Sequence, residues 1–174
     1  MSEFSLRLAN QTDVPEIMEI MSAAHSAMVD PSDYITDPED YVRVHVSEKG
    51  FIVLGMDGEE IAGFFMAVLP AYVRENTGYE LDFSEEILCR TAILDSVAVR
   101  PAAQGQGLMG MLLQEALRRL AGEADFFVAT VSPNNAASLH NFEKCGFHPL
   151  KEIRKPGGQI RYLMGLGFTA LPIL

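Results

Sequence analysis

The sequence predicts an α/β (α+β) fold, a single domain in which a mixed central β-sheet is flanked by helices on both faces. A chain of 174 residues can bury a substantial core and still suits one domain. Apolar stretches with strand-like alternation or β-branched side chains are interspersed with stretches of helical period. Their order along the chain, β-α-α-β-β-β-α-β-α-β-β, indicates a mixed sheet covered by helices.

The N-terminal part is predicted to form a strand followed by two helices. Residues 4–8 alternate apolar and polar side chains, as a half-buried strand does. Thr12 or Asp13 can cap the first helix, because a proline and an acidic residue follow in its first turn. The same start signal recurs before the second helix, which we expect to run from about 37 to 49 and to end at Gly50.

A hairpin and an irregular segment are predicted next. Residues 51–54 and 61–69 are two apolar strands, and the pair Asp57-Gly58 between them favours a tight turn. Residues 70–90 lose the regular pattern. We interpret them as an irregular insertion with a short helix near 84–88.

The C-terminal part is predicted to alternate strands and helices. Its first strand is continuously apolar and β-branched, which is typical of a buried central strand. The expected elements are a strand at 91–99, a helix at 108–120, a strand at 126–131, a short helix capped by Asn134 or Asn135 and ended by Gly146, and closing strands at 147–153 and 159–163.

The negative charge of the chain is concentrated in its first half. The whole chain carries a net charge of −11. Residues 1–90 hold 5 Lys and Arg against 18 Asp and Glu, a net charge of −13, whereas residues 91–174 hold 8 against 6, a net charge of +2. Nucleic acid is therefore an unsuitable partner, because phosphate binding needs clustered positive charge. Either a solvated acidic surface or a cleft that attracts a cationic acceptor explains this asymmetry.

The composition points to a cytoplasmic protein without a membrane partner. No apolar run approaches the ~20 residues that span a bilayer. We expect no signal peptide, because Met1 to Phe4 are not a cationic start that leads into an apolar stretch. The two cysteines, Cys89 and Cys145, make neither a disulfide framework nor a metal site. A reducing compartment and a metal-free site are the resulting expectations.

The segment Gln104 to Gly110, with the sequence QGQGLMG, lies between a predicted strand and a predicted helix. Glycines at such a junction let backbone N–H groups gather around an anion, and the following helix directs its positive dipole end to the same place. This arrangement is typical of a pyrophosphate site. A glycine-rich turn alone is a weak signal, because glycine also serves any tight turn.

The residues around this loop resemble the GNAT acyltransferases. Their acyl-coenzyme A loop has the form Gln/Arg-x-x-Gly-x-Gly/Ala after a strand that ends in Val-x-Pro, and here residues 95–101 read DSVAVRP before Gln104. A second match follows downstream, where Asn135, Ser138 and residues 142–147 (FEKCGF) resemble Asn-x-x-Ser/Ala and Tyr-x-Lys-x-Gly-Phe. Two motifs in the expected order and spacing, over about residues 91–148, make the resemblance specific.

The resemblance implies acetyl-CoA as the cosubstrate and a set of residues that bind it. The strand backbone would pair with the pantetheine arm, the loop would hold the pyrophosphate, and an asparagine would hydrogen-bond the arm. The implied coenzyme residues are Val97, Ala98, Val99, Gln104, Gly105, Gln106, Gly107, Leu108, Met109, Gly110, Asn135, Ser138 and Phe142.

Two of these positions depart from the family pattern. Met109 stands where the family has Gly or Ala, although its backbone N–H remains available to a phosphate. Phe142 stands where many members carry a tyrosine that protonates the departing thiolate. The usual acid step is therefore in question for this chain.

Asp95 is the catalytic candidate that the resemblance indicates. It occupies the position where several family members place a glutamate that deprotonates the amine. The ordinary pKa of an aspartate is ~3.9, so this role requires burial or a proton relay through water. The alternative for Asp95 is a structural carboxylate that bonds nearby backbone.

Six other side chains with chemical potential have simpler interpretations. We expect His25, His45 and His140 to be surface or cap residues, His148 to lie on a strand, Cys145 to be a packing residue and Tyr162 to pack in the sheet.

The leading hypothesis is an N-acetyltransferase that moves an acetyl group from acetyl-CoA to a primary amine of a small molecule or peptide, with a cationic acceptor. Residues 1–90 would form the acceptor side and residues 91–174 the acyl-CoA side. The alternative is a non-catalytic acyl-CoA-binding or sensing domain, which the loss of tyrosine at Phe142 favours. A dinucleotide oxidoreductase would need a glycine-rich turn after the first strand, which is absent. A homodimer is left open.

Overall fold

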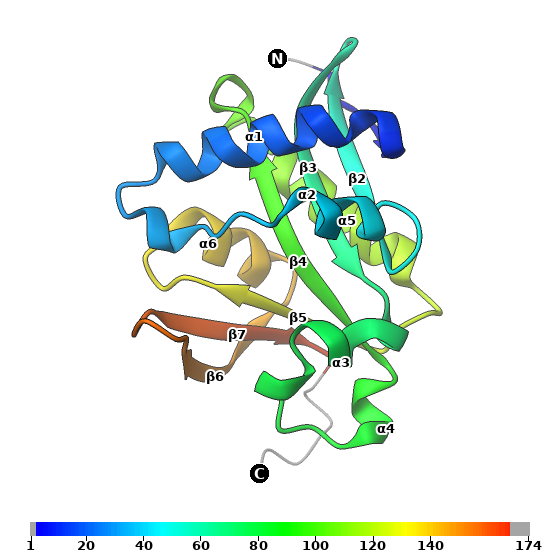
Figure 1. Cartoon of the computed structure of the whole chain (residues 1–174), viewed down its shortest axis with the longest axis vertical. Helices are drawn as coiled ribbons and strands as arrows, with labels where there is room; N and C mark the ends of the chain where they lie inside the picture. The colour runs from blue at the N-terminus through cyan, green and yellow to red at the C-terminus, as the bar shows by residue number, and fades with distance from the viewer. Residues whose placement is uncertain (1–2, 168–174) are drawn as a thin grey trace. The chain divides into compact units, whose positions relative to one another are not determined.

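The structure is a computed structural model that describes residues 3–167, and its strands form a mixed sheet in the order β1-β2-β3-β4-β5-β7-β6 (Figure 1). β4 and β5 run parallel, whereas β1 with β2, β2 with β3, β5 with β7 and β6 with β7 are antiparallel. The predicted mixed sheet is confirmed. The strands are β1 Ser5–Leu8, β2 Gly50–Asp57, β3 Glu60–Val68, β4 Thr91–Val99, β5 Phe126–Val131, β6 His148–Arg154 and β7 Ile160–Leu166.

The helices of the described residues follow the predicted order, and the insertion contains one short helix, α3, in addition to the predicted one, α4. The longest two, α1 and α5, carry an apolar face at helical spacing. The bounds are α1 Val14–Ala27, α2 Glu39–His45, α3 Val73–Asn76, α4 Glu85–Leu88, α5 Leu108–Leu120 and α6 Ala136–Lys144.

The chain divides into two compact units, and the division passes through β4. The first unit comprises Met1–Val68 and Asp95–Arg119, and the second comprises Leu69–Leu94 and Leu120–Leu174. The first unit therefore contains the predicted base, the glycine loop and the whole segment between β1 and β3.

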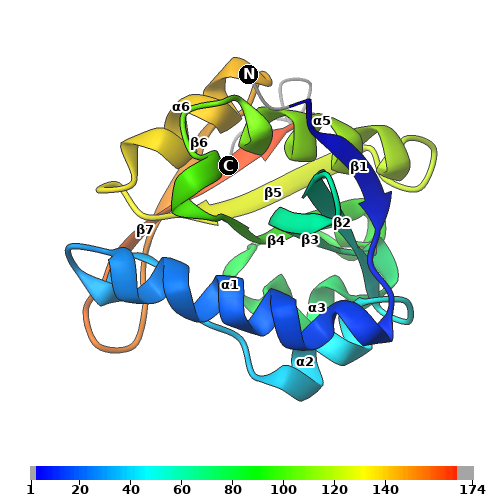
Figure 2. The same cartoon turned by 90° about the horizontal axis from the view of Figure 1, so that it is seen from above.

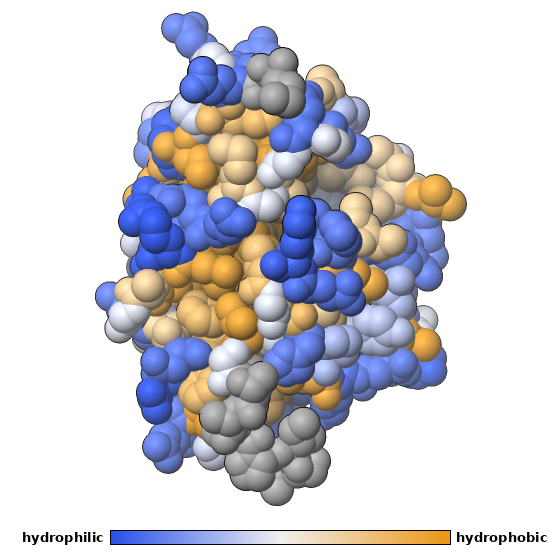
Figure 3. Space-filling model, turned by 180° about the vertical axis from the view of Figure 1, so that it is seen from behind, coloured by the Kyte–Doolittle hydropathy of each residue, from blue (hydrophilic) through white to orange (hydrophobic). Residues whose placement is uncertain are grey.

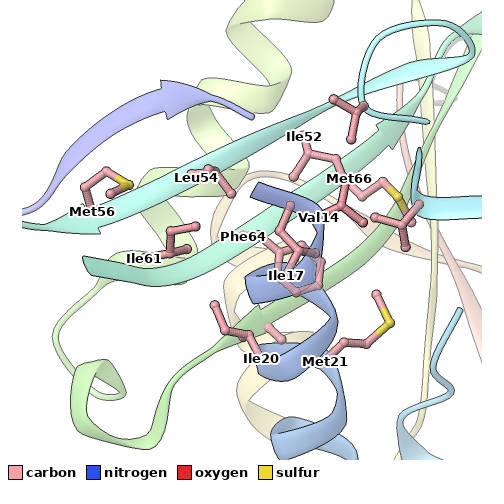
Figure 4. Packing of buried hydrophobic residues seen from close by; sticks show 13 residues of the cluster. Val14, Ile17, Ile20, Met21, Ile52, Leu54, Met56, Ile61, Phe64 and Met66 are labelled. Atoms are coloured by element: carbon pink, nitrogen blue, oxygen red, sulfur yellow. The ribbon is translucent and has the colours of Figure 1, made fainter. Parts of the chain in front are cut away.

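In the first unit, helices lie on both faces of the β2–β3 hairpin (Figure 2). On one face, α1 and α2 pack their apolar side chains against alternate residues of the two strands (Figure 4). Each large apolar side chain that is fully buried contributes about 1.5–3 kcal/mol to the stability of the fold. The core cluster consists of Val14, Ile17, Ile20, Met21, Val42, Val46, Ile52, Leu54, Met56, Ile61, Phe64, Met66 and Ala98.

On the other face of the hairpin, the first residue of α5 packs against a strand glycine. A Cβ added to Gly55 would lie 2.5 Å from Cδ1 of Leu108, whose side chain is 1% exposed. Any larger residue at position 55 would push Leu108 away. The close approach of Gly55 thus positions the start of α5, where the glycine loop ends.

Residue Asn10, and not Thr12 or Asp13, supplies the side-chain cap before α1. A 3-10 turn at Gln11–Asp13 precedes the helix, so the chain turns earlier than predicted. The Oδ1 of Asn10 accepts from Thr12 N at 2.8 Å, and Asp13 Oδ2 accepts from Asn10 N at 2.8 Å. Asp13 does occupy the N-cap position of α1, but its side chain instead forms a bidentate pair with Arg7.

The second helix ends earlier than predicted, at His45, and Gly50 begins β2 instead of ending the helix. The amides of Glu48 and Lys49 both donate to the carbonyl of Val44, which closes a turn before the strand. Gly50 pairs with Val68 in the hairpin, and a Cβ there would lie 2.0 Å from a backbone oxygen of β3. The glycine therefore serves a close approach of strands.

In the second unit, residues 69–90 form a series of short helical turns. The predicted short helix near 84–88 is confirmed as α4. Ion pairs join this insertion to the β6–β7 hairpin, from Asp82 to Lys151 and from Glu80 to Lys155. The closing strands are confirmed as an antiparallel pair, but β7 extends to Leu166 because it pairs with β5 as far as that residue.

The surface combines hydrophilic and hydrophobic residues, as the face in Figure 3 shows. The large apolar side chains that stay exposed among the described residues are Leu8, Val29, Ile35 and Met111. Within residues 3–167, every helix is too short or too polar to cross a membrane.

Candidate functional site

The second half of β4 carries the predicted base and the predicted coenzyme strand. Asp95, Val97 and Val99 are half-buried, whereas Ser96 and Ala98 are buried. Because successive strand residues point to opposite faces, the aspartate and the two valines share one face of β4. These three residues are therefore partly accessible to solvent.

Residues from α2 and from the connection between α1 and α2 gather around Asp95. The phenol of Tyr41 donates to Oδ2 of Asp95 at 2.8 Å. The phenol of Tyr34 and the hydroxyl of Ser96 lie 3.0 Å apart, at hydrogen-bond distance. Asp37 lies close enough to Asp95 for the charge of Asp95 to raise the pKa of Asp37. We call these five residues the Asp95 cluster.

Asp37 is a carboxyl group of the cluster whose surroundings shift its protonation strongly. Burial, and then the negative charge of Asp95, raise the pKa of Asp37 to about 7. Its backbone N–H points to Sδ of Met21 at 3.1 Å, which fixes the residue against α1. Near neutral pH this carboxyl group can both hold and release a proton, as an efficient general base must.

The two tyrosines of the cluster are neutral at physiological pH. Burial is the main cause that raises the pKa of Tyr34 and of Tyr41 far above the ordinary value. The charges of Asp37 and Asp95 act in the same direction on both phenols. The negative charge of the cluster therefore comes from the two aspartates alone.

Two histidines position these tyrosines. The rings of His45 and Tyr41 are 4.1 Å apart at 33°, and Nδ1 of His45 lies 2.7 Å from the carbonyl oxygen of Tyr41. Nδ1 of His25 lies 2.7 Å from the carbonyl oxygen of Tyr34. The expectation that His45 is a surface or cap residue is wrong, because its side chain is 2% exposed and packs on Tyr41. His25 is half-buried in the last turn of α1.

The glycine loop has the backbone geometry of an anion site. Gly105 and Gly107 have φ values of 73° and 83°, in the left-handed region that other residues rarely adopt. Residues 104–107 are exposed, and α5 begins at Leu108 as predicted. The first-turn N–H groups of a helix lack intrahelical partners, so those of α5 are available to a phosphate beside the loop.

The ends of the loop are fixed by hydrogen bonds within the first unit. Nε2 of Gln104 donates to the carbonyl of Val99 at 3.1 Å, and Nε2 of Gln106 donates to the carbonyl of Ala102 at 2.9 Å. The guanidinium of Arg100 bonds the carbonyl of Ile61 and the carboxylate of Glu16. A Cβ added to Gly105 or Gly107 would meet nothing within 4 Å. The loop is thus anchored and open, which fits a bound pyrophosphate.

The remaining implied coenzyme residues lie in the second unit, at α6. Asn135 caps this helix, and its Oδ1 accepts from the amide of Ser138 at 3.0 Å. Phe142 is 2% exposed and packs edge-to-face on Phe147, with ring centroids 5.1 Å apart. Burial raises the pKa of Cys145, which disfavours a nucleophilic thiolate and agrees with a packing role.

The sequence-predicted residues therefore fall into three groups. Asp95 and the strand residues 97–99 lie on β4, residues 104–110 lie at the start of α5, and Asn135, Ser138 and Phe142 lie on α6. The first two groups are parts of the first compact unit. His140 is exposed as expected, His148 lies on β6, and Tyr162 is half-buried on β7.

A comparison with protein families identifies this arrangement. The model of the acetyltransferase (GNAT) family matches residues 14–147, most of the chain. The chain belongs to the acetyltransferase (GNAT) family. Among curated proteins, no sequence shows a significant match to it.

Solved structures share the fold of this GNAT chain. The ribosomal-protein-S18-alanine N-acetyltransferase from Escherichia coli is 19% identical, with a TM-score of 0.70 over 94% of this chain and 93% of that one. An N-acetyltransferase from Staphylococcus aureus Mu50 is 18% identical, with a TM-score of 0.70 over 95% and 98%. Arabidopsis thaliana NAA60 in complex with acetyl-CoA is 14% identical, with a TM-score of 0.71 over 94% and 99%.

The sequence motifs of this GNAT chain do not reveal the residues that surround Asp95. Asp37 serves in the sequence only as part of a helix start signal, and Tyr34 and Tyr41 belong to no motif. Their one sequence signal is their place in the acidic first half, ahead of the hairpin. Within residues 3–167, no three His, Cys, Asp or Glu side chains are grouped so that they could hold a metal ion.

Proposed function

We propose that this GNAT chain transfers an acetyl group from acetyl-CoA to a primary amine of a small molecule or peptide. The observation that carries the proposal is the anchored loop before α5, with positive φ at Gly105 and Gly107 and exposed residues at 104–107. Family membership supports the same reaction. The names of the similar solved structures give different acceptors. The proposal therefore specifies the class of acceptor and not one acceptor.

In this proposal, Gln104 to Gly110 hold the pyrophosphate through backbone N–H groups, and the backbone of residues 97–99 pairs with the pantetheine arm. Asn135, Ser138 and Phe142 are the further coenzyme residues that family resemblance implies. Asp95 acts on the acceptor amine. The functional unit is the single domain 1–174, with acceptor recognition mainly in residues 1–90 and coenzyme binding mainly in residues 91–174.

A cationic acceptor suits the charge of the first half. Residues 1–90 carry a net charge of −13, and a carboxylate pair in the Asp95 cluster offers a counter-charge to an ammonium group. A lysine-like amine has a pKa of ~10.4, so only about one molecule in a few thousand is uncharged at pH 7. The site must therefore bind the ammonium form and remove its proton.

The second candidate function is a non-catalytic acyl-CoA sensor, which the environment of Phe142 favours. Phe142 packs on Phe147 and has no acidic proton to give to a departing thiolate. A thiolate with a pKa near ~8.5, by analogy with cysteine, leaves tolerably well without one. We therefore prefer the enzyme.

Two measurements on the purified chain test the proposal. Thermal unfolding with and without acetyl-CoA tests binding, with NAD as the control ligand. Release of free thiol from acetyl-CoA, across a panel of amino acid amides, aliphatic diamines and short peptides, tests transfer. Stabilisation by NAD but not by acetyl-CoA would overturn the coenzyme assignment. Stabilisation by acetyl-CoA without thiol release from any amine would favour the sensor.

A further inference from the structure

The Asp95 cluster contains two carboxylates in unlike surroundings, and the acid–base roles of such a pair follow from that difference. Asp95 accepts a hydrogen bond from Tyr41 at 2.8 Å. The carboxylate of Asp37 is half-buried, and none of the groups that the structure describes donates a hydrogen bond to it. A donated hydrogen bond favours the ionised form of a carboxyl group, whereas burial without one favours the protonated form.

We propose that Asp37, and not Asp95, is the base that takes the proton from the acceptor amine, while Asp95 binds the acceptor as its counter-charge. The inference rests on the proposed acetyl transfer and assigns the roles within that site. It makes the connection between α1 and α2 part of the catalytic machinery. The acceptor class that it names is a primary ammonium ion.

The elements that hold Asp37 support this role. Pro38 follows Asp37 and is the N-cap residue of α2, and the amide of Asp37 contacts Sδ of the buried Met21 on α1. The residue is thus held between two packed helices and is not part of a free loop. The titratable groups around it are Asp95 on β4, Tyr34 in the same connection and Tyr41 on α2. His25 and His45 contact the two tyrosines.

The reaction balances with these groups alone. The acceptor ammonium gives one proton to the carboxylate of Asp37, and the neutral nitrogen forms a bond to the acetyl carbonyl carbon. The bond between this carbon and sulfur breaks, and the thiolate leaves with the electron pair. A second proton of the nitrogen passes to the thiolate, which gives the amide and free coenzyme A. Asp37 then returns its proton to water.

The protonation behaviour of Asp37 agrees with the assignment. Its pKa is raised to about 7, mainly by burial and further by the charge of Asp95. The rate constant kcat/KM should therefore increase with pH through an acid limb near 7. Removal of the charge at Asp95 should move this limb to lower pH, whereas removal of the carboxylate at Asp37 should abolish it.

The test uses three isosteric variants and the panel amine that gives the highest thiol release with the wild type. Asp37→Asn should lower kcat by roughly 10²–10⁴-fold and remove the acid limb. Asp95→Asn should raise KM for the amine and keep the limb, displaced to lower pH. Asp40→Asn is the matched control, because Asp40 is an exposed aspartate three residues away in α2 and should leave the profile unchanged.

The outcomes separate this inference from the proposed function. Acetyl-CoA stabilisation that survives in Asp37→Asn shows that the variant folds and retains the coenzyme site. A wild type that releases thiol while Asp37→Asn keeps its rate and its acid limb would overturn the role of Asp37 and leave the acetyltransferase intact. Loss of the limb in Asp95→Asn but not in Asp37→Asn would assign the base to Asp95. A wild type that binds acetyl-CoA yet acetylates no amine would overturn the proposed function itself.

Discussion

The phenol of Tyr41 donates a 2.8 Å hydrogen bond to Oδ2 of Asp95, across 54 residues of sequence. This bond connects α2 to β4 within the first unit. The ring that carries the phenol is itself packed on the buried His45. The orientation of the central carboxylate therefore depends on the packing of the second helix.

The substitution Tyr41→Phe removes this bond and keeps the ring. A hydrogen bond to a charged group is worth about 1.5–3 kcal/mol, so kcat/KM for the amine should fall about tenfold to a hundredfold. Tyr34→Phe is the comparison variant. Tyr34 pairs with the neutral hydroxyl of Ser96, so this substitution should lower kcat/KM less than Tyr41→Phe does. Steady-state kinetics on both variants checks this prediction, and equal losses would contradict it.

Asp37 should make the stability of the fold depend on pH. Its pKa is about 7 in the folded chain against an ordinary 3.8, so the folded state holds a proton that the unfolded state releases. The free energy of unfolding should therefore fall as pH rises from about 4 to about 7. A shift of about three pKa units limits this loss in the free energy of unfolding to about 4 kcal/mol. Because Asp37 is partly exposed, we expect a loss of about 1–3 kcal/mol.

The variant Asp37→Asn lacks this ionisation and should be more stable than the wild type at pH 8, with the difference smaller at pH 5. Urea unfolding at the two pH values measures the effect, and Asp40→Asn serves as the control for loss of one exposed charge. Parallel stability of Asp37→Asn and wild type across this range would show that Asp37 ionises normally.

The glycine loop should lose its function when Gly107 becomes β-branched. Acetyl-CoA at ~100 times its Kd should stabilise the fold by ~2.7 kcal/mol, or about 5–10 °C in Tm for a chain of this size. Gly107→Val should abolish this shift, because its side chain would enter the open space beside the loop.

Gly122→Val controls for strain in this experiment. Gly122 has a φ of 89° and also has open space beside it, but it lies outside the loop. Both variants should lose basal stability through left-handed strain of about 1–2 kcal/mol. A full coenzyme shift retained in Gly107→Val would move the pyrophosphate site elsewhere.

Ionic strength should separate the two explanations of the acidic first half. If the charge of −13 on residues 1–90 attracts a cationic acceptor, kcat/KM should fall as salt shortens the screening length from ~10 Å at 0.1 M to ~3 Å at 1 M. The control is a short peptide from the same panel whose carboxylate balances its ammonium group, so that its net charge is zero. If kcat/KM for a cationic acceptor does not depend on salt, the acidic residues form a solvated surface and do not attract the acceptor.

Much of the fold could be predicted from local patterns. The period-two alternation at 4–8, the turn signal at Asp57-Gly58 and the apolar run at 91–99 each reflect a preference of adjacent residues. The two runs became strands, and the hairpin formed with its turn one residue later, at Gly58 and Glu59, because Asp57 pairs with Glu60. Local patterns failed where a distant contact decided the outcome. Gly50 resembles a helix terminator, but the carbonyl of Ala67 on the neighbouring strand leaves no room for a side chain there.

The candidate site divides in the same way. The glycine loop is a contiguous motif, so its residues and the start of α5 at Leu108 were evident from the chain. Asp37 and Tyr41 are close in sequence but far from Asp95, and they meet it only because α1 and α2 pack on the hairpin beside β4. Burial and the charge of a partner distant in sequence determine the pKa of Asp37, and only the folded chain creates both conditions.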